Sequence, residues 1–80
     1  MRLDKYLKVS RIIKRRTVAN EACDNGRVMI NEKPAKASSQ VKEGDVLEIS
    51  FGNKTVKVKV IYAAENVKKQ ESKEMYEVIS

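Results

Sequence analysis

The chain has 80 residues and a mass of 9.1 kDa, which suits one small domain with a single hydrophobic core. It contains no His and has one cysteine, Cys23, so neither an internal disulfide nor a His/Cys metal site can form. Without His the usual general base is missing, and the eleven acidic residues are scattered along the chain. We therefore expect one non-catalytic domain over residues 1–80 that uses no cofactor and no metal.

The positive charge of the chain is concentrated at the N-terminus. Of the net charge of +6, all comes from residues 1–16, which carry seven basic side chains and the single acid Asp4. A compact basic end of this kind gives a protein an electrostatic face that suits a polyanion. No apolar stretch is long enough to span a membrane, and the charged N-terminus lacks the pattern of a signal peptide or a myristoylation site. We expect a cytoplasmic protein.

Residues 2–9 are predicted to form a short helix. Leu3, Tyr6 and Leu7 lie at positions i, i+3 and i+4, which gives the helix one apolar stripe. Residues 12–13 are expected to form a further turn against the core, and residues 14–16 an exposed connector.

A second helix is predicted from Thr17 to about residue 24 or 25. Thr17 is a favoured N-cap residue, although Asn20 stands where a complete capping box has Glu or Gln. Gly26 is expected to end this helix in the left-handed conformation. The expected buried side comprises Val18, Ala22 and Cys23.

After Gly26 the apolar period changes to two, which predicts strands. Val28 and Ile30 are expected to face inward on the first strand, and a turn at 31–34 leads to a short return strand at 35–37. A second turn at 42–45 precedes two longer strands, 46–51 and 54–61, joined by a type II′ turn at 52–53. The inward-facing residues expected there are Leu47, Ile49, Phe51, Val56, Val58 and Val60.

The C-terminal part is predicted to be a helical turn or loop over 63–74, followed by a strand at 75–79 that pairs with the hairpin. The element order predicts an α+β fold. Two short N-terminal helices would pack on a small, mostly antiparallel sheet of about four or five strands.

Several short motifs, taken together and in order, resemble the alpha-L RNA-binding domain, the type named after a small-subunit ribosomal protein, S-four. The motif core covers residues 1–51, and the hairpin and C-terminal strand follow over residues 46–80. The residues that carry the resemblance are Arg2-Leu3-Asp4-Lys5-Tyr6-Leu7, Arg15-Arg16-Thr17, Asn25-Gly26-Arg27-Val28, Ile30-Asn31, Lys36, Ser38-Ser39 and Val41-Lys42-Glu43-Gly44-Asp45.

Among the stand-alone members, the sequence is most similar to the RqcP family of bacterial ribosome-associated quality-control factors. This resemblance implies binding to large-subunit rRNA and to P-site tRNA, on a large ribosomal subunit that carries an obstructed peptidyl-tRNA. It also implies support for C-terminal tailing of the stalled chain by the partner RqcH. We expect a monomer.

The candidate RNA-binding residues are mostly basic and are expected to converge on one surface. Arg16 precedes the expected Thr17 cap, so a phosphate could accept hydrogen bonds from its guanidinium and from the free N–H groups of a helix N-terminus. Asp4 is expected to pair with Arg2 or Arg16 and to orient that side chain. Lys36 and Ser38 are added from the resemblance alone. The full set is Arg2, Lys5, Lys8, Arg11, Lys14, Arg15, Arg16, Thr17, Lys36 and Ser38.

Other interpretations stay open at this point. A plainer one is that these cations only solubilise the helix surface and that Asp4 only begins the first helix. A heat-shock-type rescue factor for split large subunits is a second, although such relatives carry a long basic C-terminal extension that this sequence lacks. An accessory domain of an RNA-modifying enzyme is a third. Membrane-surface binding is a fourth, disfavoured by the narrow apolar stripe of the first helix.

Overall fold

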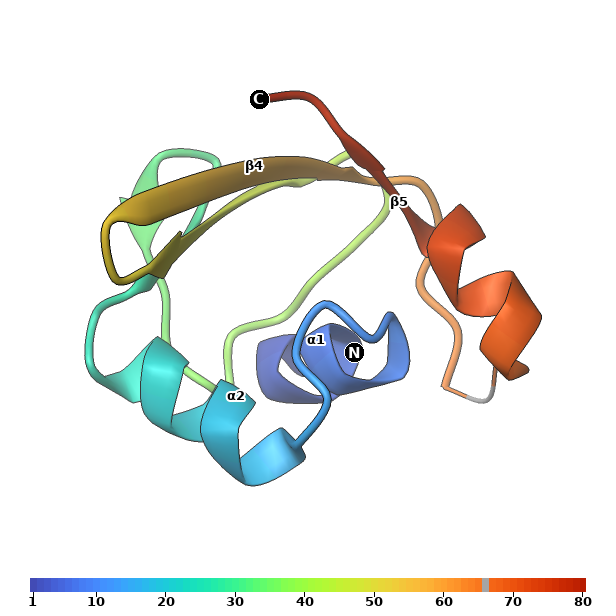
Figure 1. The fold of residues 1–80 in the computed structure, drawn as a ribbon, viewed down its shortest axis with the longest axis horizontal. Coiled ribbons are helices and arrows are strands. Elements are labelled where there is room, and N and C mark those ends of the chain that lie inside the picture. Colours follow the sequence, from blue (N-terminus) through green and yellow to red (C-terminus); the bar gives the residue numbers. More distant parts are fainter. Residues whose placement is uncertain (66) are drawn as a thin grey trace.

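The computed structural model describes residues 1–65 and 67–80. Two α-helices at the N-terminus precede an antiparallel sheet with the strand order β2-β1-β3-β4-β5. This arrangement confirms the predicted α+β fold (Figure 1). The elements are α1 (Leu3–Val9), α2 (Arg16–Asp24), β1 (Val28–Ile30), β2 (Lys33–Pro34), β3 (Val46–Phe51), β4 (Lys54–Val60), the 3₁₀ helix η1 (Lys69–Met75) and β5 (Tyr76–Val78).

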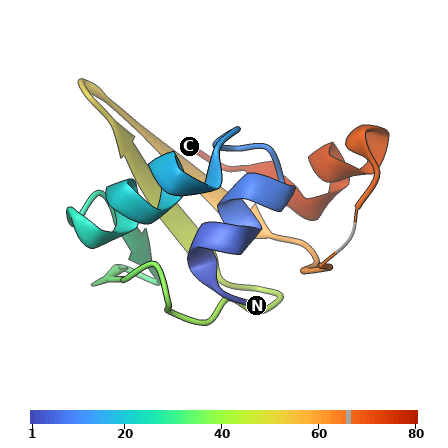
Figure 2. The same cartoon turned by 90° about the horizontal axis from the view of Figure 1, so that it is seen from below.

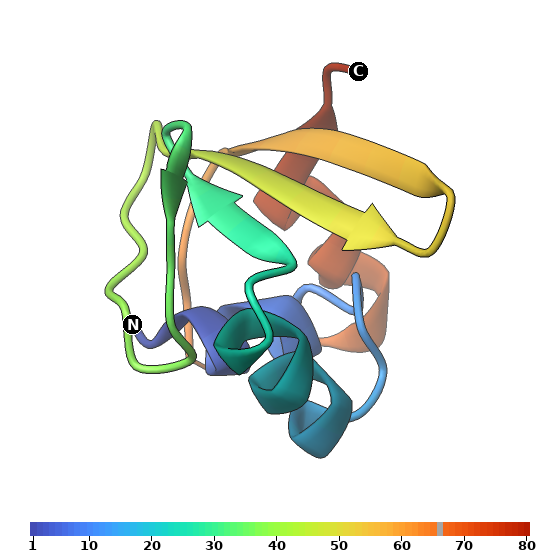
Figure 3. The same cartoon turned by 90° about the vertical axis from the view of Figure 1, so that its left-hand side faces the viewer.

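The two α-helices cover one face of the sheet, and the core lies between the two layers (Figure 3). The other face of the sheet carries polar side chains such as Lys59 and Glu77. Burial of each Leu, Ile or Val side chain in such a core contributes about 1.5–3 kcal/mol. The large, fully buried apolar side chains include Leu3, Tyr6, Leu7, Val28, Leu47, Ile49, Val58, Val60 and Met75.

Helix α1 forms where the sequence predicts it, with Leu3, Tyr6 and Leu7 all buried. The hydroxyl of Tyr6 donates a 2.7 Å hydrogen bond to the main-chain oxygen of Met75. This bond joins the N-terminal helix to the end of η1, and burial raises the pKa of the Tyr6 phenol. Among the described residues, no helix is long and apolar enough to cross a bilayer.

Helix α2 differs from the prediction at its start. It begins at Arg16, with Arg15 as the N-cap and no side-chain capping bond, so the predicted Thr17 cap is wrong. The prediction that Val18 is buried is also wrong, since Val18 is 48% exposed and Ala19 is buried in its place, whereas Cys23 is buried as predicted and Ala22 is half-buried. Successive residues of an α-helix are about 100° apart, so a face centred on Ala19 and Cys23 leaves Val18 about 120° away.

The end of α2 confirms the role predicted for Gly26. This glycine has a φ of +75° in the left-handed region. Its N–H donates to the oxygen of Cys23 at 3.1 Å, and the N–H of Arg27 donates to the oxygen of Ala22 at 3.0 Å. This pair of bonds is the Schellman arrangement that satisfies the last carbonyl groups of a helix.

The first hairpin turns earlier than predicted. Asn31 and Glu32 have φ values of +50° and +68°, as in a type I′ turn, and Ile30 pairs with Lys33. The return strand is therefore β2, and the predicted strand at 35–37 is wrong. The left-handed turn is supported by the side chain of Asn31, which accepts a hydrogen bond from the N–H of Val46 at 2.9 Å.

The second hairpin matches its prediction. Gly52 has a φ of +59° and Phe51 pairs with Lys54, as a two-residue II′ turn requires. Phe51 was expected inside but is 42% exposed, because it lies at the tip of the hairpin, which extends past the helices in Figure 2. The segment 63–74, predicted as a helical turn or loop, forms the helix η1 only from residue 69, while residues 63–65 and 67–68 are loop and residue 66 lies outside the described residues. The last predicted strand is β5, which pairs with β4.

Candidate nucleic-acid interface

The carboxylate of Asp4 lies at the centre of the candidate interface. Asp4 stands in the first turn of α1 and is only 2% exposed. Its Oδ1 accepts hydrogen bonds from Arg2 Nε at 3.2 Å and from the N–H of Lys5 at 2.8 Å. Its Oδ2 accepts from Arg16 Nε at 3.4 Å and from Asn20 Nδ2 at 3.2 Å. One buried carboxylate therefore holds two arginines that lie fourteen positions apart in the sequence.

A buried carboxylate is stable only if it is paired, and the surroundings of Asp4 meet that requirement. Burial by itself opposes the charged form. The hydrogen bonds from Asn20 and Arg2 and the nearby charge of Arg16 outweigh it, so the pKa of Asp4 lies below its usual value. Asp4 is thus ionised at neutral pH and can hold both guanidinium groups.

The two arginine side chains stay partly in solvent, although Nη2 of Arg2 also donates to Oδ2 of Asp4 at 3.4 Å. The side chains of Arg2 and Arg16 are 46% and 48% exposed, respectively. A guanidinium has five N–H donors in a planar fork, and the Nε atoms face Asp4. The terminal nitrogens of Arg16 can then reach a planar or tetrahedral anion such as a phosphate.

Beside Arg16 lies a shallow hollow at the N-terminus of α2. Its volume is about 330 Å³, and Thr17, Asn20 and Glu21 contribute to its lining. No side-chain hydrogen bond caps the first N–H groups of α2. Arg16 is the first residue of α2, and it lines this hollow together with Thr17.

Lys36 and Ser38 lie near the Asp4–arginine group, which comprises Asp4, Arg2 and Arg16. These two exposed residues belong to a segment whose main chain accepts hydrogen bonds from the start of α1: the N–H of Leu3 donates to the oxygen of Ser39 at 2.7 Å, and the N–H of Asp4 to that of Ala37 at 3.2 Å. The loop and the arginine pair therefore share one side of the molecule, where the resemblance places RNA-contacting residues.

Four of the remaining cations lie toward the other end of α1. Three of them, Lys8, Arg11 and Lys14, line a separate hollow of about 540 Å³ at the other end of α1. Lys5 also faces that end, with its Nζ 3.5 Å from Glu65. The expected single surface is thus two groups of cations, with the exposed Arg15 between them in the chain.

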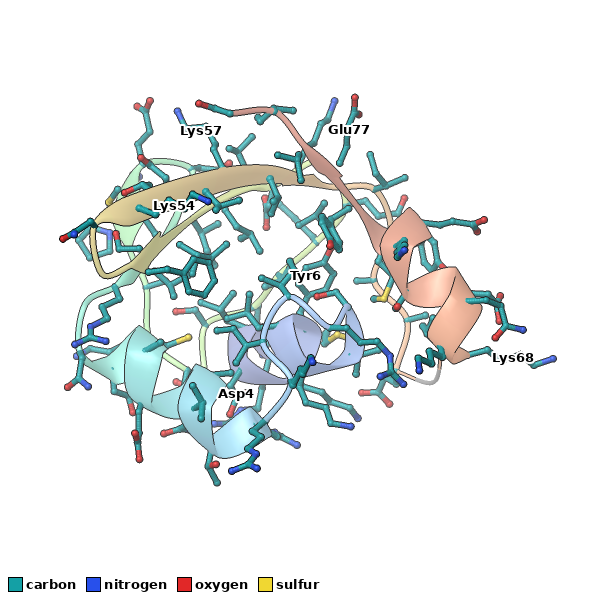
Figure 4. The ribbon with its side chains drawn as sticks, in the orientation of Figure 1. Asp4, Tyr6, Lys54, Lys57, Lys68 and Glu77 are labelled. Atoms are coloured by element: carbon teal, nitrogen blue, oxygen red, sulfur yellow. The ribbon has the colours of Figure 1, made fainter. Side chains whose placement is uncertain are left out.

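One contributor to the site was not identified from the sequence. The sequence places Asn20 only in an incomplete capping box, yet its amide donates a hydrogen bond to the Asp4 carboxylate. The spacing of Arg16 and Asn20 does indicate that they act together, since Asn20 lies one helical turn after Arg16 on the same face of α2. Its partner is sixteen positions away, so this signal has meaning only once α1 and α2 are packed together (Figure 4).

Comparison with known proteins matches the motif region and also the whole chain. A family model described as the S4 domain matches residues 1–47. A protein of Streptococcus pneumoniae named "RQC P-site tRNA stabilizing factor" is 56% identical over 80 residues, which is 100% of this chain and 91% of that protein. Its namesake in Bacillus subtilis is 54% identical over 79 residues, 99% of this chain and 92% of that one.

The fold matches a solved structure as well. The trimeric structure of Vibrio cholerae Heat Shock Protein 15 aligns with a TM-score of 0.90 and 25% sequence identity, covering 100% of this chain and 82% of the other. The similarity therefore includes the C-terminal elements that lie beyond the matched S4 region.

Proposed function

Because this chain belongs to the S4 domain family, we propose that it is a non-catalytic RNA-binding factor of the large ribosomal subunit. On subunits with an obstructed peptidyl-tRNA it would bind rRNA and stabilise the P-site tRNA. In that state it would support C-terminal tailing of the stalled chain by RqcH. Relatives named for P-site tRNA stabilisation, 54–56% identical over nearly the whole chain, support this assignment.

The arrangement of Arg2 and Arg16 on the buried carboxylate of Asp4 is the observation that carries the proposal. Flexible surface lysines attract any polyanion. Two arginines held by one carboxylate instead present their donors in a defined geometry, which suits the phosphates of a folded RNA. The adjacent N-terminus of α2 adds main-chain donors to the same surface.

Recognition by this surface would depend on the shape and backbone of the RNA. Base stacking needs exposed aromatic rings, yet Tyr6 is buried and Tyr62 and Tyr76 are half-buried. The single phenylalanine, Phe51, lies at the tip of the β3–β4 hairpin, on a different part of the molecule. We therefore expect binding that weakens steeply as the salt concentration rises.

Co-sedimentation with purified large subunits that carry peptidyl-tRNA tests the proposal. The double variant Arg2→Gln/Arg16→Gln should lose most of the binding. A matched control, Lys57→Gln/Lys59→Gln, removes the same charge from the opposite face of the sheet and should bind as the wild type does (Figure 4 labels Lys57). Equal loss in both variants, or in neither, would refute a specific role for the arginine pair.

The likeness to Heat Shock Protein 15 over the whole chain favours a second candidate function, recycling of split large subunits. The two candidates differ in their products. A tailing factor requires RqcH and leaves stalled nascent polypeptides with C-terminal extensions. Mass spectrometry of these polypeptides from wild-type cells and from cells that lack this protein would detect the extensions. Unchanged tails in the deletion strain would favour the recycling function.

A further inference from the structure

The larger hollow, at the C-terminal end of α1, lies apart from the Asp4–arginine group. Residues from α1 and the turn after it form one wall: Lys8, Val9, Arg11 and Lys14. Residues from η1 and the segment before it form the other: Glu65, Val67, Lys68 and Glu71. The second wall lies outside residues 1–47, which are those matched by the S4 model. The α1–η1 hollow is therefore built by the fold of this chain as a whole.

Positive charge predominates in the α1–η1 hollow. The lining of this hollow of about 540 Å³ includes four cationic side chains, three on the α1 wall and Lys68 on the η1 wall, against two carboxylates. One of these carboxylates, Glu65, is 3.5 Å from the ammonium group of Lys5, a cation that is not part of the lining. The charge of Glu65 is thus balanced in part from outside the hollow, which leaves a net attraction for an anion.

Arg11 has a backbone conformation that glycine adopts more readily than arginine. Its φ is +63°, in the left-handed region that side chains with a Cβ atom rarely adopt. It follows Ser10, the C-cap of α1, at the position where helices usually have glycine. Among the described residues Arg11 makes no ion pair that would explain why arginine and not glycine stands at this position. Residues held in such conformations cluster at functional sites.

We infer that the α1–η1 hollow is a second RNA site, in which Arg11 binds a backbone phosphate between the ammonium groups of Lys8 and Lys14. This inference rests on the proposed function, since it assumes that RNA is the partner. It adds a contact that the Asp4–arginine group does not provide. Three cations that line one hollow suit successive phosphates of one strand better than they suit a single small anion.

Substitution Arg11→Gly provides a test in which folding and binding respond differently. Glycine adopts a positive φ without strain, so thermal stability should stay the same or rise. Affinity for large subunits that carry peptidyl-tRNA should fall about threefold to tenfold. The slope of log affinity against log salt should become shallower by about 0.7–0.9, the value for one lost phosphate contact. Lys59→Gln, on the outer face of the sheet, is the matched control and should leave the affinity and the salt slope unchanged.

The outcomes separate this inference from the proposed function. If Arg2→Gln/Arg16→Gln weakens binding but Arg11→Gly and Lys8→Gln/Lys14→Gln do not, the second site is refuted and the proposed function stands. If none of these variants weakens binding, both fail. If Arg11→Gly weakens binding to intact subunits but not to deproteinised rRNA and tRNA, the hollow contacts a protein, and the inference of an RNA site is overturned.

Discussion

Replacing Asp4 by asparagine distinguishes two explanations of RNA binding by the Asp4–arginine group. Asp4→Asn keeps the size of the side chain and removes one negative charge. If net charge alone governed binding, the more positive variant would bind RNA more tightly. If Arg2 and Arg16 must be held in place, the variant loses their common anchor and binds more weakly. The structure favours the second result, because both Nε atoms lie within 3.4 Å of the carboxylate.

The expected cost in stability follows from the contacts of Asp4. Each ion pair joins the carboxylate to a half-exposed arginine and contributes about 0–1 kcal/mol. The 3.2 Å hydrogen bond from Asn20 contributes about 1 kcal/mol more. The sum is about 1–3 kcal/mol, against about 4–12 kcal/mol for a domain of this size. The variant therefore stays folded, with a melting temperature lower by about 4–8 °C for each kcal/mol.

Binding to large subunits with peptidyl-tRNA should weaken about tenfold or more, which corresponds to about 1.4 kcal/mol or more. The assay is co-sedimentation at two salt concentrations, with a circular dichroism melt on the same preparation. Glu77→Gln makes the same change of charge on β5, on the outer face of the sheet (Figure 4), and serves as control. If folded Asp4→Asn bound as tightly as wild type or more tightly, the orienting role of Asp4 would be refuted.

Three further predictions concern stability. Because the pKa of Asp4 is lower in the folded protein than in the unfolded chain, the contribution of Asp4 to the free energy of unfolding is complete above pH about 4 and is lost as the pH falls below that value. Urea unfolding from pH 6 to 2 should show this loss of stability in the wild type, and the Asp4→Asn variant should lack it. Thr17→Ala should change the unfolding free energy by less than about 0.5 kcal/mol, since its hydroxyl caps nothing; a loss near 1 kcal/mol would instead indicate a cap. Tyr6→Phe should cost only about 1 kcal/mol, because the oxygen of Met75 keeps a 2.8 Å bond from the N–H of Ile61; a melting point equal to wild type would contradict the importance of the buried hydroxyl.

Elements with a strong local pattern were predicted well. The stripe of Leu3, Tyr6 and Leu7 specifies α1, and Gly52 followed by Asn53 specifies the turn of the long hairpin. In both cases the deciding interactions lie within a few residues of one another, so periodicity and turn preference contain the necessary information. The pairing of Asp4 with Arg2 or Arg16 was predicted from the motif resemblance, and the structure shows an ion pair with each.

Elements whose position depends on their neighbours were predicted less well. Val18 is more apolar than Ala19, yet Ala19 is buried, since the side of α2 that faces the core is chosen by its packing against α1 and β1. The start of α2 at Arg16 and the early turn at Asn31 likewise depend on contacts between distant residues, which a local sequence motif does not predict. The Asn31 side chain reaches Val46 and Asp45, fourteen or more positions away.

The sequence alone determined that the chain is a small α+β protein with a basic N-terminal end, because composition and local periodicity are properties of the linear chain. Only the tertiary structure decided that the basic residues form two groups. Packing of α1 against α2 brings Arg16 to Asp4, whereas the return of the chain from β4 to η1 brings Glu65 and Lys68 beside Lys8. Charges far apart in sequence act together only where the folded backbone holds them within a few ångströms, and that distance is set by the packing of the core.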